Sequence, residues 1–174
     1  MPLDSLLQVA QVAAPRCDPA FDRGAPNSPA REAWMALAKR YSQTRSAADL
    51  ERLPRVEGKR PRLYAVRVLT PEAYTAVMAL GTLEQRVALA VRAGVPSYRD
   101  EHGASHDAPL ESGTTGAPLA TSAWLRTLQG VGGGQLLTEL AAVVIRRYEI
   151  GDPEDCDGAD PLDLHHLGGL RLGR

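Results

Sequence analysis

The sequence contains few aromatic residues, only two cysteines and no long apolar run. Phe, Trp and Tyr together make up 5% of the 174 residues, whereas hydrophobic residues make up 44%. Leu, Val and Ala must therefore fill the core, which favours a core built from helices. Cys17 and Cys156 can form one disulfide, but two cysteines are too few for a thiolate metal cluster. Because no stretch approaches the roughly 18 apolar residues of a membrane span, we expect no membrane partner.

A targeting signal and a strong overall charge are also absent. The first residues, MPLDSLLQVAQVAAP, lack the basic start and long apolar stretch of a signal peptide, which predicts synthesis in the cytoplasm. The formal net charge is -1, so the whole chain has no attraction to nucleic acid or membranes. The charge is nevertheless uneven: residues 31–67 contain ten Lys or Arg against four Asp or Glu, and residues 151–174 contain six acids against two arginines.

The length predicts one folded domain with irregular segments around it, since domains commonly contain about 100 to 150 residues. We expect a helix and a proline-rich arm in residues 1–27, a helical core in residues 28–151 with a long loop at 95–120, and an acidic, glycine-rich tail in residues 152–174. The expected fold class is mainly α. It comprises a small helical domain with one short β-strand or hairpin, a long irregular N-terminal arm, a mid-chain loop and a C-terminal tail.

Capping residues and apolar spacing locate the individual elements. A short amphipathic helix is expected at residues 3–12 and the strongest helix at residues 135–148, where apolar side chains form a wide stripe. Four further helices are expected to begin where a hydroxyl precedes a helical pattern, at Ser28, Ser46, Thr70 and Thr82. Alternating apolar residues predict one strand at 63–69, and the glycine run at 130–134 is interpreted as a joint between two helices.

The acidic stretch DCDGAD near the C-terminus is the first candidate for a metal site. Its carboxylates are the hard oxygen ligands that calcium loops use: Asp155, Asp157, Asp160 and Asp163. The calcium-loop template fails, because alignment on Gly158 places Pro153 at the first ligand position and Leu164 at the last. We therefore interpret this stretch as a solvated acidic tail.

Two groups of histidines also suggest metal binding at first sight. Cys156 with His165 and His166 offers three ligands on one short segment, but the adjacent histidines point apart and no fourth ligand is near. His102 and His106 have the i, i+4 spacing of zinc ligands on a helix, yet the polar, glycine-containing sequence around them predicts a loop. We expect neither a metal nor another cofactor.

Motifs for catalysis are not found in the sequence. The run GVGGGQLLT could expose backbone N–H groups to a phosphate, but Gln135 stands where a P-loop requires lysine. No nucleophile elbow of the form GxSxG occurs, and serine, histidine and carboxylate form no motif that we can name. We therefore assign no catalytic residue and no small-molecule substrate, and we expect that the protein is not an enzyme.

A basic stretch, RLPRVEGKRPRLYAVR, is the strongest candidate for a binding surface. Its cations lie close together in the sequence: Arg52, Arg55, Lys59, Arg60 and Arg62. They could contact a phosphate backbone, which makes a nucleic-acid-binding module in the stretch Arg52–Arg67 the alternative function. No recognisable module surrounds them, so we favour an acidic protein surface as the partner. Trp34 and Trp124 are the aromatic residues expected to anchor such contacts.

Two segments together carry a resemblance to a known class of proteins. In RLYAVRVLTPEAYTAVMALGTLEQRVALAVRAGV a short strand leads into capped helices, and TELAAVVIRRYEIGD follows after a variable loop. This layout, over about half of the chain, resembles the small tail-assembly chaperones and minor structural proteins of tailed bacteriophages. The resemblance implies no catalytic residues. The proline-rich arm and acidic tail depart from a compact chaperone, and suit a virion component whose ends extend across neighbouring subunits.

We therefore expect a non-enzymatic structural or assembly protein that makes protein–protein contacts in a larger particle. Its partners would be other protein subunits, including copies of itself, and the particle would be a bacteriophage virion or tail. Contact would be made through the N-terminal arm, the loop at 95–120 and the tail, which would become ordered upon binding.

Overall fold

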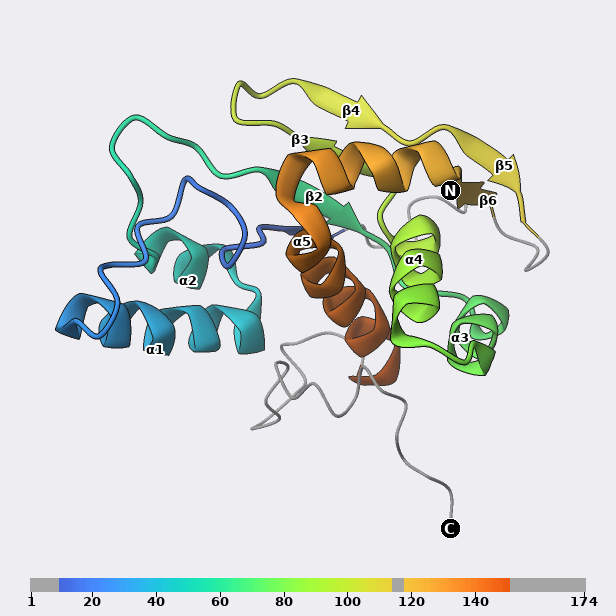
Figure 1. Ribbon diagram of the computed structural model, residues 1–174, viewed down its shortest axis with the longest axis horizontal. Coiled ribbons are helices and arrows are strands. Elements are labelled where there is room, and N and C mark those ends of the chain that lie inside the picture. The colour runs from blue at the N-terminus through green and yellow to red at the C-terminus, as the bar shows by residue number, and fades with distance from the viewer. Residues whose placement is uncertain (1–9, 114–117, 151–174) are drawn as a thin grey trace, which may run out of the picture.

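The computed structural model describes residues 10–113 and 118–150 and shows a mixed fold of helices and antiparallel sheets (Figure 1). Helices account for 52% and strands for 15% of the structure. The expected fold class, mainly α with one strand or hairpin, is therefore wrong, because two separate antiparallel sheets are present.

Five helices are present in the described residues, and the expected capping residues begin four of them. These are α1 (Pro29–Thr44), α2 (Ala47–Arg52), α3 (Pro71–Ala79), α4 (Leu83–Gly94) and α5 (Ser122–Ile150). Ser28, Ser46, Thr70 and Thr82 each accept a hydrogen bond from the backbone N–H three residues later. These predictions are confirmed because a cap depends on residues that are adjacent in the sequence.

The larger sheet has four short strands in the order β1-β2-β3-β4, all antiparallel. They are β1 (Ala10–Val12), β2 (Leu63–Val66), β3 (Ser97–Arg99) and β4 (Ser105–Asp107). A separate hairpin-like pair is formed by β5 (Leu110–Ser112) and β6 (Pro118–Ala120). The strand expected at 63–69 is found, in shortened form, as the second strand of the larger sheet.

Two expectations fail at the sheets. The mid-chain loop expected at 95–120 contains β3, β4, β5 and β6, and the end of the helix expected at 3–12 is β1. In both cases pairing with distant residues decides the conformation: Ala10 lies opposite Val66, and Tyr98 lies opposite Tyr64. Strands of three residues have too little alternation to be recognised from a sequence, and long-range pairing overrides a weak local helical pattern.

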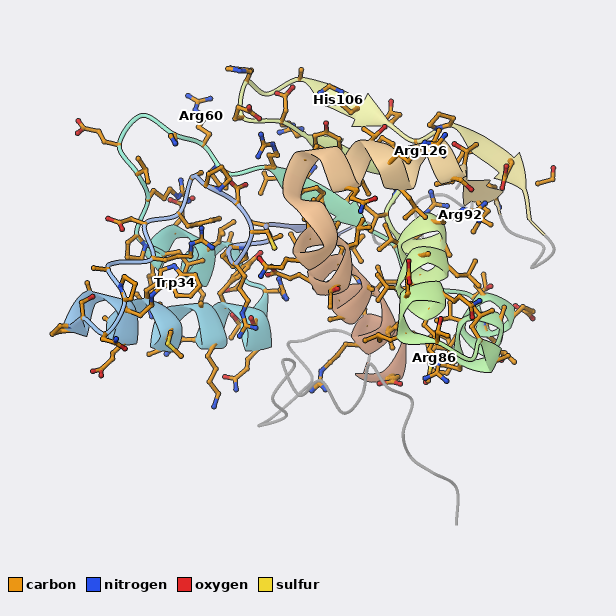
Figure 2. The ribbon with its side chains drawn as sticks, viewed as in Figure 1. Trp34, Arg60, Arg86, Arg92, His106 and Arg126 are labelled. Atoms are coloured by element: carbon orange, nitrogen blue, oxygen red, sulfur yellow. The ribbon has the colours of Figure 1, made fainter. Side chains whose placement is uncertain are left out.

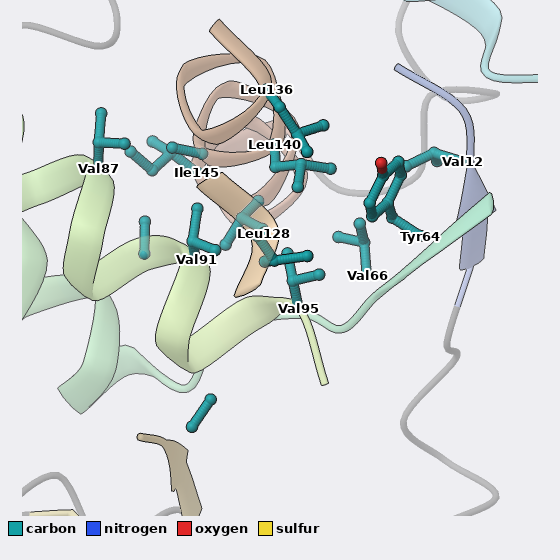
Figure 3. Close-up of a cluster of buried hydrophobic side chains, with 14 of the residues drawn as sticks. Val12, Tyr64, Val66, Val87, Val91, Val95, Leu128, Leu136, Leu140 and Ile145 are labelled. Atoms are coloured by element: carbon teal, nitrogen blue, oxygen red, sulfur yellow. The ribbon is translucent and has the colours of Figure 1, made fainter. Parts of the chain in front are cut away.

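The larger hydrophobic core lies between α4, α5 and the four-stranded sheet (Figure 3). Val87, Val91 and Val95 approach α5 from one side, and Val12, Tyr64 and Val66 approach from the sheet. The side chains that α5 contributes include Leu128, Leu136, Leu140 and Ile145. Helices α4 and α5 come very close at Gly94, so an added Cβ at this position would collide with the Val144 side chain. This core holds α3, α4, α5 and the sheet together.

A second, smaller core includes side chains of α1, which lies with α2 on the left in Figure 1. Its buried residues are Ala13, Phe21, Trp34, Ala38, Tyr41 and Leu53. We call residues 13–62, which contain α1, α2 and these side chains, the small lobe. The expected N-terminal arm contributes directly, since Ala13, Ala20 and Phe21 are buried and Asp18 accepts hydrogen bonds from the backbone of Ala20 and Arg62.

Helix α5 consists of two helical segments that meet at a kink, which confirms the joint that the sequence predicts in the glycine run at 130–134. It bends at Gly133, whose φ of 70° is left-handed and suits glycine. By length and composition α5 is apolar enough to cross a membrane. Its apolar residues are nevertheless used in the larger core, and Glu139 lies among them, so packing within the fold accounts for its composition.

Candidate functional site

The basic stretch lies on the surface of the small lobe, in the segment that connects α2 to β2. Three of its cations have acidic partners: Arg52 lies 3.6 Å from Asp49, Arg55 lies 3.0 Å from Glu51, and Arg62 forms a two-point contact with Glu101. Lys59 and Arg60 are exposed, and within residues 10–113 and 118–150 neither forms an ion pair with an acid. Figure 2 shows Arg60 on the segment between α2 and β2. The positive charge available to a partner is therefore smaller than the sequence indicates and is concentrated at these two residues.

The turn that carries Lys59 and Arg60 is held firmly at its base. The Val56 N–H donates to the Ala20 carbonyl at 2.8 Å, and the Asp22 N–H donates to the Pro54 carbonyl at 2.9 Å. Within the turn, the Lys59 N–H donates to the Val56 carbonyl, and Gly58 takes a left-handed conformation. We call residues 56–60 the basic turn. Because its base is anchored, its cations are presented from a fixed support.

Beside the basic stretch, the sheet carries a row of rings that the sequence did not reveal. Tyr64, Tyr98 and His106 lie opposite one another on β2, β3 and β4, and successive ring centroids are 5.7 and 4.6 Å apart. Tyr64 and Tyr98 are buried, whereas the His106 side chain is 42% exposed. Trp124 covers Tyr98 from α5 at 5.8 Å. The row therefore belongs mainly to the core and reaches the surface at His106.

The two histidines do not form a metal site. His106 lies on β4 and its Nε2 is 2.8 Å from Asp100 Oδ2, whereas His102 lies in the exposed turn before β4. The hydrogen bond with His106 lowers the pKa of Asp100 to about 2, assisted by the backbone N–H groups of Ala104 and His102. No group of three metal-binding side chains occurs in the part of the chain that the structure describes. The acids Asp155, Asp157, Asp160 and Asp163 lie outside that part.

Trp34 and Trp124 are both core residues. Trp34 is 5% exposed and packs in the small core beneath α1, where Arg31 lies 5.9 Å from its ring centre. Trp124 is 3% exposed and its indole N–H donates to the Val95 carbonyl at 2.9 Å. Both side chains stabilise the fold from inside, so neither offers a ring to a partner on the surface.

Beside the larger core, Cys17 of the small lobe makes a polar contact with Glu139 of α5. The Cys17 thiol donates to Glu139 Oε2 at 3.5 Å, while Glu139 Oε1 is buried without a hydrogen-bond partner. Burial raises the pKa of Glu139, and the charges of Arg45 and Arg16 oppose this shift. Burial and the adjacent carboxylate raise the pKa of Cys17 to about 12, so its thiol is protonated and a poor nucleophile. This contact links the small lobe to α5 and offers no catalytic group.

Formal charge differs strongly between the parts of the chain. The small lobe contains eleven Lys or Arg against six Asp or Glu, whereas residues 63–150 contain seven against eight. The six acids and two arginines of residues 151–174 have the opposite sign from the small lobe. The basic turn is therefore the exposed tip of a positively charged lobe.

No family model, curated protein or solved structure matches this chain. The fold and the surface described above are therefore the grounds on which function is argued. Among them, the basic turn is the feature that combines exposure, unneutralised charge and a rigid base.

Proposed function

We propose that this protein is a non-enzymatic structural or assembly component that joins a larger particle by protein–protein contacts through its small lobe. The observation that carries the proposal is the basic turn, where Lys59 and Arg60 project from an anchored loop on a lobe of net positive charge. Its partner is an acidic surface of another subunit, and residues 151–174 of a second copy have the required charge. The resemblance to tail-assembly and minor structural proteins supports a bacteriophage virion or tail as the particle.

Exposed ion pairs alone would give weak binding, because each contributes about 0 to 1 kcal/mol. Apolar contacts must therefore add to the affinity. Val56, in the basic turn itself, is 37% exposed, and Met35 on α1 is 58% exposed. The small lobe thus presents apolar side chains as well as cations to a partner, which suits a protein surface better than a charge-only contact.

The nucleic-acid alternative is less well supported by the same surface. Three of the five cations already have acidic partners, and Glu57 lies within the basic turn. Binding of a duplex backbone depends on several unneutralised cations that each displace a counterion from a phosphate. Lys59 and Arg60 provide two such cations, so any attraction to DNA should be weak and strongly dependent on salt.

A synthetic peptide of residues 151–174 provides a direct probe of the acidic partner. We expect the full chain to bind the labelled peptide in fluorescence anisotropy at low salt. The variant Lys59→Glu/Arg60→Glu should weaken this binding by roughly tenfold, which corresponds to the loss of two surface ion pairs. The matched control Arg99→Glu/Arg126→Glu has the same change of charge at exposed positions elsewhere and should bind as the wild type does.

Two outcomes would overturn the proposal. Equal binding by both charge variants would show that the basic turn does not select the acidic partner. The nucleic-acid alternative would be favoured if the chain bound a random DNA duplex and did not bind the peptide. That binding should depend steeply on salt and be abolished by Lys59→Glu/Arg60→Glu.

A further inference from the structure

The small lobe is inserted between two neighbouring strands of the larger sheet. Strand β1 ends at Val12 and β2 begins at Leu63, and Val12 lies opposite Tyr64 in their antiparallel pairing. Residues 13–62 therefore leave the sheet and return to it at adjacent positions. In Figure 1, α1 and α2 lie to the left of α5, whereas α3 and α4 lie to its right. A segment whose two ends meet at one strand pair can rotate as a body, because a few residues at the ends of the strands absorb the change.

Most of the stabilising contacts of the small lobe lie within the lobe itself. Its buried side chains form a cluster separate from the larger core, to which residues 13–62 contribute only Ala14 and Cys17. Two hydrogen bonds connect the first residue of the lobe with α1 and the residue after it. The Ala13 N–H donates to the Tyr41 hydroxyl at 2.9 Å, and the Arg45 guanidinium donates to the Ala13 carbonyl at 3.3 Å. These contacts are retained if the lobe moves away from α5.

The polar contact between the lobe and α5 buries a carboxylate that is incompletely solvated. Glu139 is 8% exposed, and its Oε2 accepts from the Cys17 thiol, whereas its Oε1 is buried without a hydrogen-bond partner. The charges of Arg45 and Arg16 favour the ionised form, yet within the described residues neither forms an ion pair with it. Burial disfavours a charged group that is not fully compensated, and water would solvate both oxygens if the lobe moved away. Glu139 therefore weakens the attachment of the lobe to α5.

An ion pair also joins the small lobe to the turn before β4. Arg62 Nε lies 3.0 Å from Glu101 Oε2, and Arg62 Nη2 donates to Glu101 Oε1 at 3.1 Å. Arg62 immediately precedes β2, so this contact is made at the point where the chain returns to the sheet. A rotation of the lobe about that point moves the ion pair little.

We propose that the small lobe detaches from α5 as a folded body, by rotation about its two connections to the sheet, and that Glu139 sets how readily it does so. Detachment differs from unfolding of the lobe, because α1, α2 and the smaller core stay formed. The detached state exposes the Cys17 thiol and the face of α5 around Glu139 to solvent. This motion does not depend on the proposed function, since it concerns how the lobe is held and not what the lobe binds.

Thiol labelling of Cys17 in the full chain tests this motion, with Cys156→Ser in every sample so that a single thiol reacts. Labelling by N-ethylmaleimide and hydrogen exchange of the α1 amides each give an opening equilibrium constant, measured at increasing urea. We expect the opening that exposes Cys17 to be at least about tenfold more populated than the one that exposes the amides between Trp34 and Tyr41. It should also depend less on urea, because detachment exposes less surface than unfolding does.

Glu139→Leu should slow the labelling of Cys17 by roughly tenfold, because the attached lobe then no longer buries a carboxylate. Glu139→Gln keeps the size of the side chain, should slow labelling in the same direction, and serves as the test if the first variant does not fold. The matched control is Glu57→Leu, at an exposed acid in the basic turn, which should label as the wild type does.

Two results would overturn this inference. Equal opening constants and equal urea dependence for Cys17 and the α1 amides would show that the lobe unfolds in place and does not detach as a body. Labelling of Glu139→Leu and Glu139→Gln that is as fast as that of Glu57→Leu, or faster, would show that the buried carboxylate does not weaken the attachment to α5.

Discussion

Twenty buried side chains form the larger core, whereas six form the core of the small lobe. The larger core is apolar throughout and joins α3, α4, α5 and the sheet. The smaller core depends in addition on a hydrogen bond with the segment before α1, in which the Ala13 N–H donates to the Tyr41 hydroxyl. Stability differs within a protein according to local burial. We therefore expect the small lobe to open before the rest of the molecule.

The largest expected effect is the loss of a side chain from the larger core. Leu140 is 1% exposed and packs among α4, α5 and the sheet. Leu140→Ala should lower the free energy of unfolding by about 2 to 5 kcal/mol, measured by urea denaturation. The control Leu110→Ala removes a side chain that is 54% exposed and should cost at most about 0.5 kcal/mol. Similar losses at both positions would contradict the assignment of the larger core.

A smaller effect is expected where a hydrogen bond joins the residue after β1 to α1. The Ala13 N–H donates to the buried Tyr41 hydroxyl at 2.9 Å. Tyr41→Phe leaves that N–H buried without an acceptor, which should cost about 1 to 3 kcal/mol. The loss should appear as faster hydrogen exchange in α1 and α2, with α4 unchanged.

Tyr74→Phe provides the matched control for this change. The Tyr74 hydroxyl donates to Glu149 at 2.6 Å in an exposed position, where water can replace the lost partner. Its removal should therefore cost less than about 1 kcal/mol. If Tyr41→Phe accelerated exchange equally in α1 and α4, the two cores would open together and the comparison between them would fail.

The smallest expected effect concerns the pH dependence contributed by Glu139. Burial raises the pKa of Glu139 above the ordinary glutamate value of 4.5, so the folded state holds its proton more tightly than the unfolded state does. Stability is therefore lost as the pH rises from about 4.5 through the folded pKa. Glu139→Gln should remove this loss, and at pH 4 it should change the free energy of unfolding by at most about 1.5 kcal/mol.

Thermal or urea unfolding between pH 4 and pH 8 measures this dependence. As the pH rises, the free energy of unfolding of the wild type should fall relative to that of Glu139→Gln. Glu57→Gln, a change at an exposed acid in the basic turn, is the control and should give a nearly constant difference. A constant difference for Glu139→Gln as well would show that this carboxylate is not desolvated at its contact with Cys17.

The sequence predicted the features that adjacent residues determine. Ser28, Ser46, Thr70 and Thr82 were each recognisable as helix caps, because a cap joins residues three positions apart. The strands between Ser97 and Ala120 were missed. Each has three residues and pairs with distant segments, so neither its length nor its alternation gave a signal.

The candidate site was predicted in part. The basic stretch was visible as a run of cations, but its neutralisation was not, since Glu101 approaches Arg62 from the turn between β3 and β4. The contact of Cys17 with Glu139 joins positions 122 residues apart, and no local pattern announces it. The one available signal was Glu139, a charged residue within the apolar stripe of α5, which indicates that this helix packs against a polar group of another segment.

Native-state hydrogen exchange tests most directly whether the two cores have unequal stability. We expect the amides of α1 between Trp34 and Tyr41 to exchange through an opening of lower free energy than global unfolding. Amides of α4 between Val87 and Val91 should exchange only when the whole molecule unfolds. Equal protection in α1 and α4, with the same dependence on urea, would contradict the division of this protein into a stable larger core and a weaker small lobe.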